Sequence, residues 1–200
     1  MSPVTHFLVG WLVSNTAKLD QCERALVTIA GIIPDIDGLV IIADFITRNT
    51  KHPLQWWGKF HHVLAHNIGF ALIVTLCSYI VSKQRRMTTA ILVWISFHLH
   101  LLGDLLGARG PEGNQWPIPY LLPFSNSWQW AWRGQWALNA WPNFIITGIA
   151  MSLTFYLAWK RGYSPLEMVS VKTNKTFVGI LHKRFGEPKL SNLTMNQNFN

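Results

Sequence analysis

The sequence predicts an all-α protein, a membrane-associated bundle of antiparallel helices. Half of its 200 residues are hydrophobic and only 13% are charged, whereas about a quarter of the residues of a soluble domain are charged. Several apolar stretches reach the roughly 20 residues that a helix needs to cross a bilayer. No stretch alternates polar and apolar residues as a half-buried strand does. The composition excludes an intrinsically disordered chain, and a count of two cysteines excludes a disulfide scaffold.

Five apolar stretches follow one another along the chain. The first, 6–16, is too short to cross a bilayer at about 1.5 Å per residue. The second, 24–46, is long enough but is interrupted by Pro34 and its polar neighbours, so we expect a helix from Arg24 to about Ile33, a turn and a second short helix. The last three have the full length of a span and cover residues 62–81, 88–106 and 137–159.

Positive charge is concentrated near the C-terminus. From Lys160 onward, seven Lys and Arg residues stand against two Glu, so this segment carries +5 of the net charge of +8. We therefore expect a helical, membrane-embedded domain over residues 1–160 and a basic, partly disordered tail over 161–200. Such a tail fits an anionic membrane surface or a protein partner. It contains no RNA- or DNA-binding motif, so we expect no nucleic-acid binding.

Basic residues beside the apolar stretches predict the sidedness of the chain. The turn 83–86 holds three of them, and Lys160 and Arg161 follow the last stretch, so the positive-inside rule assigns these ends to the cytoplasm. The loops 47–60 and 108–136 would then lie outside, although three basic residues in the first loop oppose this. The second loop is rich in Trp, which is typical of an interfacial aromatic belt or of a platform for a lipid or sugar substrate. The sequence thus predicts a multi-pass membrane protein.

Ionisable residues occur in these stretches, where a bilayer makes them costly. An Asp at the centre of a spanning helix costs about 2.5–3.5 kcal/mol, so such residues indicate a function. His100 and Asp104 are four residues apart and share one face of a helix, as do His62 and His66. Imidazole and carboxylate groups together are the ligands of zinc and similar divalent ions.

The alternating direction of the helices brings these residues to one end of the bundle. That end holds the start of the first helix, the turn after the second, the start of the third and the end of the fourth. Bundles build metal sites from facing helices in this way. The sequence therefore predicts a metal site at this end. The residues brought there are His6, Asp35, Asp37, His61 or His62, His66, His100 and Asp104.

Two neighbouring residues are interpreted as structural. His98 lies about 200° from His100 around a helix, so we expect it to pack elsewhere. Asp44 precedes Arg48 by four residues and is expected to cap a helix or to pair with that arginine.

The ordered set of motifs is more specific than any single motif. The motifs are Thr5-His6, Pro34-Asp35-Ile36-Asp37, His61 with His66, His100 followed by Leu-Leu-Gly and Asp104, Trp116-Pro117, and Leu121-Leu122-Pro123-Phe124. In them the chain, over roughly residues 1–125, resembles the bacterial inner-membrane metal-dependent hydrolases, also described as LexA-binding membrane-associated hydrolases. That family resembles zinc-dependent phospholipase C and the single-strand-specific zinc nucleases, which hold zinc ions among helices and cleave phosphoesters.

The resemblance implies a hydrolase of the bacterial inner membrane that uses two or three divalent ions, most often zinc, to activate water. Its substrate would be a phosphoester, either of a small molecule or of a membrane lipid. One carboxylate of the Asp35–Asp37 pair, which we take to be Asp37, would orient or deprotonate the attacking water. The implied metal ligands are His6, Asp35, Asp37, His61, His66, His100 and Asp104.

Two positions depart from the family pattern. The family has Arg after the first histidine of the third motif and Thr before the second, where this chain has His62 and Ala65. A phosphate-binding arginine is therefore missing at that position. The choice between His61 and His62 as the ligand stays open, because the family pattern favours His61 and helical spacing favours His62.

Two other classes of function use similar residues. A metal or proton transporter also places His and Asp in the membrane, but it needs polar residues along a whole pore, and this chain shows no inverted repeats. A non-catalytic membrane adaptor would use a structural metal and recruit a partner through the basic tail. A closed ligand shell would favour the adaptor, and an open coordination position would favour the enzyme.

Overall fold

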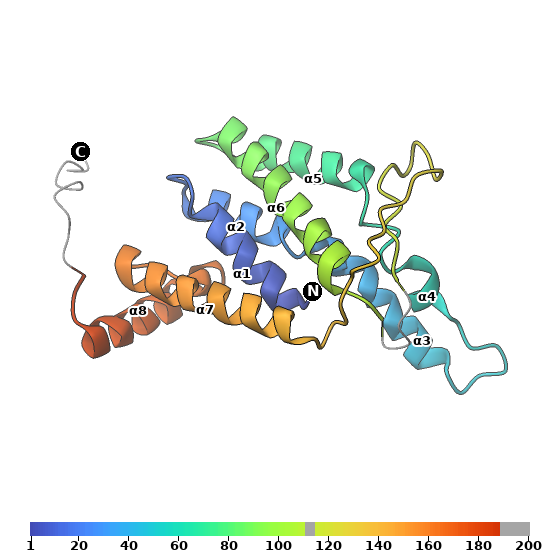
Figure 1. Ribbon diagram of the computed structural model, residues 1–200. Helices are drawn as coiled ribbons and strands as arrows, with labels where there is room; N and C mark the ends of the chain where they lie inside the picture. Colours follow the sequence, from blue (N-terminus) through green and yellow to red (C-terminus); the bar gives the residue numbers. More distant parts are fainter. Residues whose placement is uncertain (111–114, 189–200) are drawn as a thin grey trace. The chain divides into compact units, whose positions relative to one another are not determined.

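The computed structural model describes residues 1–110 and 115–188 (Figure 1). The chain divides into two compact units, Met1–Met151 and Ser152–Asn200. Within the described residues every regular element is a helix, and the only β pairing consists of two isolated bridges. The all-α class predicted from the sequence is confirmed.

Four helices of the first unit form an antiparallel bundle. They are α1 (Pro3–Ser14), α2 (Gln21–Ala30), α5 (Ile68–Val81) and α6 (Arg86–Gly107). Helix α6 contacts the other three, and α1 also lies against α2 (Figure 1). Short turns join α1 to α2 and α5 to α6, so the members of each pair run in opposite directions. The bundle is therefore the one expected from the order of the apolar stretches.

The ends of the first two helices carry sequence-encoded caps. The Ser2 side chain accepts a hydrogen bond from Thr5 N, and Pro3 opens α1 where no amide hydrogen is needed. Asp20 and Glu23 form a capping box at the start of α2.

Glycines let α1 and α2 approach each other closely. A Cβ atom added at Gly31 would lie 2.8 Å from the carbonyl oxygen of His6, and one added at Gly10 would lie 2.8 Å from the carbonyl oxygen of Thr28. No side chain fits into this crossing, so the two backbones come into contact. The crossing holds the His6 end of α1 beside the last turn of α2.

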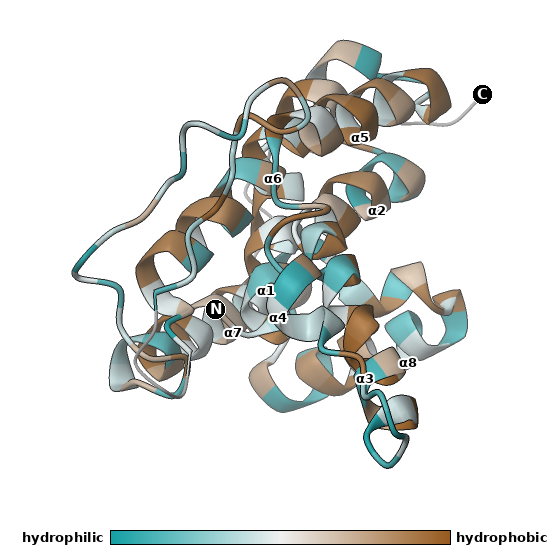
Figure 2. Ribbon diagram, turned by 90° about the vertical axis from the view of Figure 1, so that its right-hand side faces the viewer, coloured by the Kyte–Doolittle hydropathy of each residue, from teal (hydrophilic) through white to brown (hydrophobic). Residues whose placement is uncertain are grey.

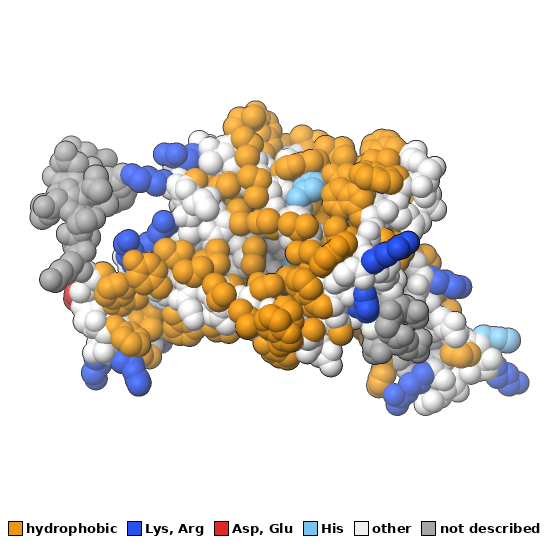
Figure 3. Space-filling view, viewed as in Figure 1, with side chains coloured by type: hydrophobic (Ala, Val, Ile, Leu, Met, Phe, Trp, Pro, Cys, Tyr) orange, Lys and Arg blue, Asp and Glu red, His pale blue; other side chains and the backbone are white. Residues whose placement is uncertain are grey.

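Within the described part of the chain, two helices are long and apolar enough to cross a membrane, α6 and α7 (Trp141–Arg161). Helix α6 confirms the expected stretch 88–106, and α7 confirms the stretch 137–159 except at its start, because the helix begins only at Trp141. Helix α2 and the segment Ile33–Thr47 are also long and apolar enough when taken together, but they are bent by 50° relative to each other. If this bent pair is one span, the described residues hold three candidate spans. Hydrophobic residues run along these helices, and many of their side chains are exposed (Figures 2 and 3).

The bent segment has the break that the sequence predicts. After α2 the chain forms a 3-10 helix, η1 (Ile33–Val40), which begins around Pro34, and then α3 (Ile41–Thr47). Asp44 of α3 accepts hydrogen bonds from the amides of Trp56 (2.7 Å) and Trp57 (2.9 Å). These residues open the short helix α4 (Trp56–Phe60), so the expected role of Asp44 as a helix cap is confirmed.

The expected span 62–81 is wrong at its start. Residues 61–67 form turns, and α5 begins only at Ile68. The Asn67 side chain caps this helix by accepting from Phe70 N, and His62 has a φ of 66°, which a helix does not allow. The turn directs several polar side chains into the protein, and the remaining 14-residue helix is shorter than a span.

The loop after α6 covers one side of the bundle core. Two isolated bridges, Arg109 with Ala137 and Ile118 with Trp130, connect residues within the loop, and the amides of Ile68 and Gly69 at the start of α5 donate to the carbonyl oxygens of Tyr120 (2.8 Å) and Leu122 (3.1 Å). The Ile118 side chain is fully buried in a hydrophobic cluster with Phe97 of α6. This packing holds the loop against α5 and α6.

The second unit contains the end of α7, a 3-10 turn η2 (Pro165–Met168) and α8 (Val171–Phe185). The Asn174 side chain accepts hydrogen bonds from Ser164 N (2.7 Å) and Ser164 Oγ (2.8 Å), which ties α8 to the turn. Disorder was expected in the tail, and its last residues, 189–200, lie outside the described residues.

Candidate metal centre

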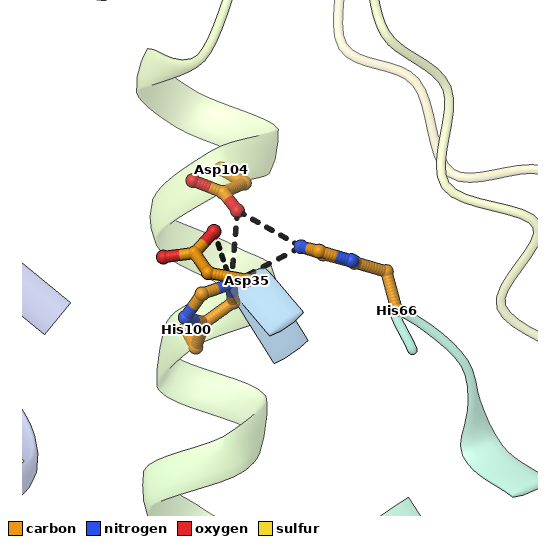
Figure 4. A group of neighbouring side chains, drawn as sticks. All are labelled: Asp35, His66, His100 and Asp104. Atoms are coloured by element: carbon orange, nitrogen blue, oxygen red, sulfur yellow. Dashed lines mark hydrogen bonds and ion pairs between the residues drawn. The ribbon is translucent and has the colours of Figure 1, made fainter. Parts of the chain in front are cut away.

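Four predicted ligands converge at one end of the bundle (Figure 4). Asp35 comes from η1, His66 from the turn before α5, and His100 and Asp104 from the last turns of α6. One ligand atom of each lies within 4.8 Å of the ligand atoms of the other three. His66, His100 and Asp104 are buried, and Asp35 is half-buried.

The ligand atoms lie close to one another. His100 Nε2 is 3.1 Å from His66 Nε2 and 3.1 Å from Asp104 Oδ2. His66 Nε2 is 3.4 Å from the same carboxylate oxygen, and Asp35 Oδ1 is 3.7 Å from His100 Nε2. Two imidazole nitrogens and two carboxylates therefore face a common point.

The far sides of the two imidazoles are held by acceptors. His100 Nδ1 donates to the carbonyl oxygen of Gly31 (2.8 Å), and His66 Nδ1 donates to Asp37 Oδ2 (2.9 Å). Because these partners can only accept, they assign the proton to Nδ1 and leave the Nε2 lone pairs directed at the shared point. Metal-bound histidines are oriented in this way by a carbonyl or a carboxylate.

Two carboxylate oxygens at this point lack partners. Asp35 Oδ2 and Asp104 Oδ2 are buried and have no hydrogen-bond partner among the described residues. Lone pairs and negative charge at such short distances repel one another, and burying an uncompensated carboxylate costs several kcal/mol. A divalent ion with nitrogen and oxygen ligands relieves both costs, so this donor set is able to hold a metal ion.

The charge of His66 responds to the same carboxylates. His66 lies before α5 and outside the candidate spans. Burial disfavours its charged form, but its contacts with Asp104 and Asp37 outweigh burial and raise its pKa to about 9. The carboxylates thus attract a positive charge to this point, and a metal ion bound there would replace the proton.

His6 adjoins the group of four from α1. Its Nε2 donates to Asp104 Oδ1 (3.0 Å), and its ring stacks on that of His100 with 3.8 Å between centroids. The amino group of Met1 contacts the same oxygen of Asp104. The structure thus brings His6 to the predicted site, in contact with one carboxylate of the cluster.

Asp37 lies behind two imidazoles. Its Oδ1 accepts from His61 Nδ1 (2.8 Å), and its Oδ2 accepts from His66 Nδ1 (2.9 Å) and from Ala65 N (3.3 Å). Both oxygens are therefore engaged by the turn 61–67. This geometry favours a positioning role for Asp37 over the activation of water.

Both histidines of the His61–His62 pair face the site. His61 reaches it through Asp37, whereas His62 Nε2 lies 3.8 Å from Asp104 Oδ2. His62 Nδ1 is buried and has no hydrogen-bond partner among the described residues. The positive φ of His62 turns the two side chains to the same region, which a regular helix could not do.

A cavity of about 1020 Å³ opens beside the cluster. Asp35, His61, His62 and Asp104 line one part of it, and the remaining wall is mostly apolar. A second cavity of about 400 Å³ also borders His61 and His62. The first lies at the upper end of the 300–1,000 Å³ that is usual for ligand pockets.

Comparison with known proteins identifies the family of this chain. The family model described as YdjM inner membrane protein matches residues 1–180. The chain belongs to the YdjM inner membrane protein family. The predicted inner-membrane family and membrane association are thereby confirmed. No curated protein and no solved structure matches the chain.

In this YdjM-family chain, His98 takes no part in the cluster. Its Nε2 lies 2.9 Å from the Tyr120 hydroxyl, and its Nδ1 donates to the carbonyl oxygen of Trp94 (2.8 Å). The expectation that it packs away from the site is confirmed.

Sequence reasoning missed three residues that shape the YdjM-family site. Gly31 supplies the carbonyl that orients His100, and a Cβ atom at Gly103 would lie 3.0 Å from His6 Cε1. A glycine inside an apolar helix signals such a close approach. Arg109 lines the large cavity, and its place five residues after Asp104 was the available signal.

Proposed function

We propose that this chain is a membrane-bound, metal-dependent hydrolase that acts on phosphoesters. The observation that supports this best is the convergence of His66, His100, Asp35 and Asp104 beside a cavity of about 1020 Å³. A structural metal site is normally closed by four protein ligands, whereas a catalytic site leaves one position for water or substrate. Asp35 and Asp104 belong both to the cluster and to the cavity wall, which favours the open arrangement.

The residues suit ions of the zinc type. When bound, such ions lower the pKa of a coordinated water towards ~7 and stabilise the oxygens of an in-line displacement. The absence of a thiolate among the ligands leaves a hard, water-binding site, which suits phosphate oxygens. The proposed ligand set consists of the group of four together with His6 and one or both of His61 and His62.

The two aspartates of η1 take different roles in this proposal. Asp35 is half-buried, lines the cavity and has one unpartnered oxygen, so it can orient the attacking water or accept its proton. Asp37 holds His61 and His66 in position, and it acts on the reaction through them. This reverses the assignment of the water-activating role to Asp37 made from the resemblance.

An assay of purified full-length protein tests the proposal. Phospholipids, nucleotides and an aryl phosphate are offered to the wild type with added metal, with chelator, and with chelator followed by metal. We expect slow hydrolysis that chelator abolishes and metal restores. Asp35→Asn should lower kcat with little change in KM, because its role is realised in the transition state. Equal rates in the wild type and in this variant, or fully metallated protein without activity on any substrate, would contradict the proposal.

We also propose that the chain crosses the membrane more than once with the cluster on the outer side. The support is the pair of full-length spans α6 and α7 and the basic turn before α6. Single cysteines at the exposed positions Gln84 and Ser127, introduced after Cys22 and Cys77 are replaced by Ser, provide the test. An impermeant thiol reagent should label position 127 in intact cells and should not label position 84. The reverse pattern would contradict this orientation.

A further inference from the structure

Arg109 is held rigidly where α6 ends. Its backbone N donates to the carbonyl oxygen of Trp136 (3.1 Å), and its own carbonyl oxygen accepts from Leu138 N (3.3 Å). At the tip of the side chain, Nη2 donates to the carbonyl oxygen of Arg133 (2.8 Å). Both the backbone of Arg109 and one nitrogen of its guanidinium are therefore anchored to the loop.

One donor of this guanidinium has no acceptor. Arg109 Nε is buried and has no hydrogen-bond partner among the described residues. A buried charged donor without a protein acceptor is unfavourable, and an anion bound beside it would lower this cost. The side chain lines the same cavity as Asp35 and Asp104.

Arg109 is also the only Lys or Arg among the described residues that line this cavity. A guanidinium presents donors in a planar fork that matches two oxygens of a phosphate. The cavity therefore combines one fixed anion-binding group with the candidate metal centre.

The remaining wall of the cavity is mostly apolar. Pro3, Ile41, Ala137, Leu138 and Phe144 line it. A bare phosphate would fill only a small part of about 1020 Å³ and would leave this surface uncovered. An alkyl group attached to the phosphate would cover this apolar surface and remove it from water, which is favourable.

We propose that Arg109 binds the phosphate of an amphiphilic phosphoester whose alkyl chain lies along the apolar wall of the cavity. The inference rests on the proposed function and narrows its substrate class to alkyl or lipid phosphates. Arg109 also supplies the phosphate-binding arginine that the third motif lacks, from a different part of the chain.

Binding of a non-hydrolysable analogue tests this inference. Dodecylphosphonate is titrated by calorimetry into metal-loaded, full-length protein in a neutral maltoside detergent. The variants are Arg109→Gln, Arg109→Lys and the matched control Arg133→Gln, which removes an exposed charge from the same region but keeps the carbonyl that holds Arg109. Metal content is measured for each sample, so that only equally loaded proteins are compared.

We expect Arg109→Gln to raise the Kd by roughly 10- to 100-fold, as the loss of a charged hydrogen bond predicts. Arg109→Lys should have a smaller effect, and Arg133→Gln should stay within about twofold of the wild type. Equal affinity of the wild type and both Arg109 variants, or absence of binding to the wild type, would overturn the inference. Arg109→Lys keeps the test decisive if Arg109→Gln does not fold.

Methylphosphonate, which has the anionic group but no long alkyl chain, shows whether the cavity prefers a lipid phosphate to a free phosphate. We expect it to bind at least about tenfold more weakly than dodecylphosphonate, and equal affinities would overturn the alkyl part of the inference. Because a phosphonate is not hydrolysed, a failure of the proposed hydrolase activity leaves this result unchanged. The two proposals can therefore fail separately.

Discussion

Two ends of the same bundle bury carboxylates in different surroundings. At the end where α5 meets α6, Glu23 is only 1% exposed. Its Oε1 accepts from Ser82 Oγ (2.5 Å), Arg85 N (2.6 Å) and Gln84 N (3.1 Å). Every contact around this oxygen is a donor, so the charge is satisfied by the protein itself.

At the opposite end, donors satisfy the carboxylates only in part. Asp35 and Asp104 each keep a buried oxygen without a hydrogen-bond partner among the described residues, and His66 and His100 direct Nε2 atoms at them. The protein thus supplies the donors around Glu23 Oε1, whereas Asp35 and Asp104 keep oxygens that are free to bind a cation. The comparison teaches that burial alone does not mark a functional carboxylate, and that the chemistry of its neighbours does.

The largest expected effect comes from replacing one buried carboxylate by an amide at each end of the bundle and comparing metal binding. Asp104→Asn should weaken metal binding by more than about 100-fold, because it removes a charged ligand. Glu23→Gln should leave metal content unchanged and should lower the Tm in detergent, at a cost of about 1–3 kcal/mol for the buried charged hydrogen bonds. Metal analysis and thermal unfolding of both variants check this. Loss of metal in Glu23→Gln would contradict the separation of the two ends.

A smaller effect is expected behind the cluster. Asp37→Asn keeps the shape of the side chain but no longer offers a charged acceptor to both His61 and His66. We expect metal affinity to fall by about 10- to 100-fold, the usual cost of losing a group that orients a ligand. Competition with a fluorescent chelator measures it. A loss as large as that in Asp104→Asn would instead make Asp37 a direct ligand.

The smallest expected effect on metal affinity comes from adding a methyl group beside His6. A Cβ atom at Gly103 would lie 3.0 Å from His6 Cε1, whereas one at Gly148 meets nothing within 4 Å. Gly103→Ala should displace His6 and lower metal affinity by a few-fold, and Gly148→Ala in α7 should leave it unchanged. The same competition measurement compares them, and equal affinities in both variants would show that His6 does not contribute.

Much of the fold could be predicted from the sequence, because the length of an apolar stretch and the charges at its ends determine where a spanning helix lies. Helix α6 matches the expected stretch within two residues at each end, since the basic turn at its start and Gly107 at its end limit the apolar run. The start of α5 was not accessible. An apolar pattern begins at residue 62, but residues 61–67 form turns that direct the side chains of His61 and His66 into the site. These tertiary contacts override the helical periodicity of the sequence.

The candidate site was predicted as a set of residue types and not as an arrangement. Antiparallel topology was enough to bring His6, His100 and Asp104 to one end, because each lies near the end of a helix. The engagement of both Asp37 oxygens and the orientation of Arg109 depend on turns and on a loop. Their conformations follow from contacts distant in the sequence, such as Arg109 with Arg133, which no local pattern reveals.

The central claim is that the His/Asp end of the bundle is a metal site, and the most direct test is the metal content of the wild type. Full-length protein is purified in detergent, stripped with chelator and reconstituted with zinc, manganese or iron at neutral pH, and bound metal is measured by mass spectrometry. The account predicts at least one equivalent per chain in the wild type, and a clear loss in His100→Ala. Wild-type protein that remains metal-free after reconstitution would contradict it.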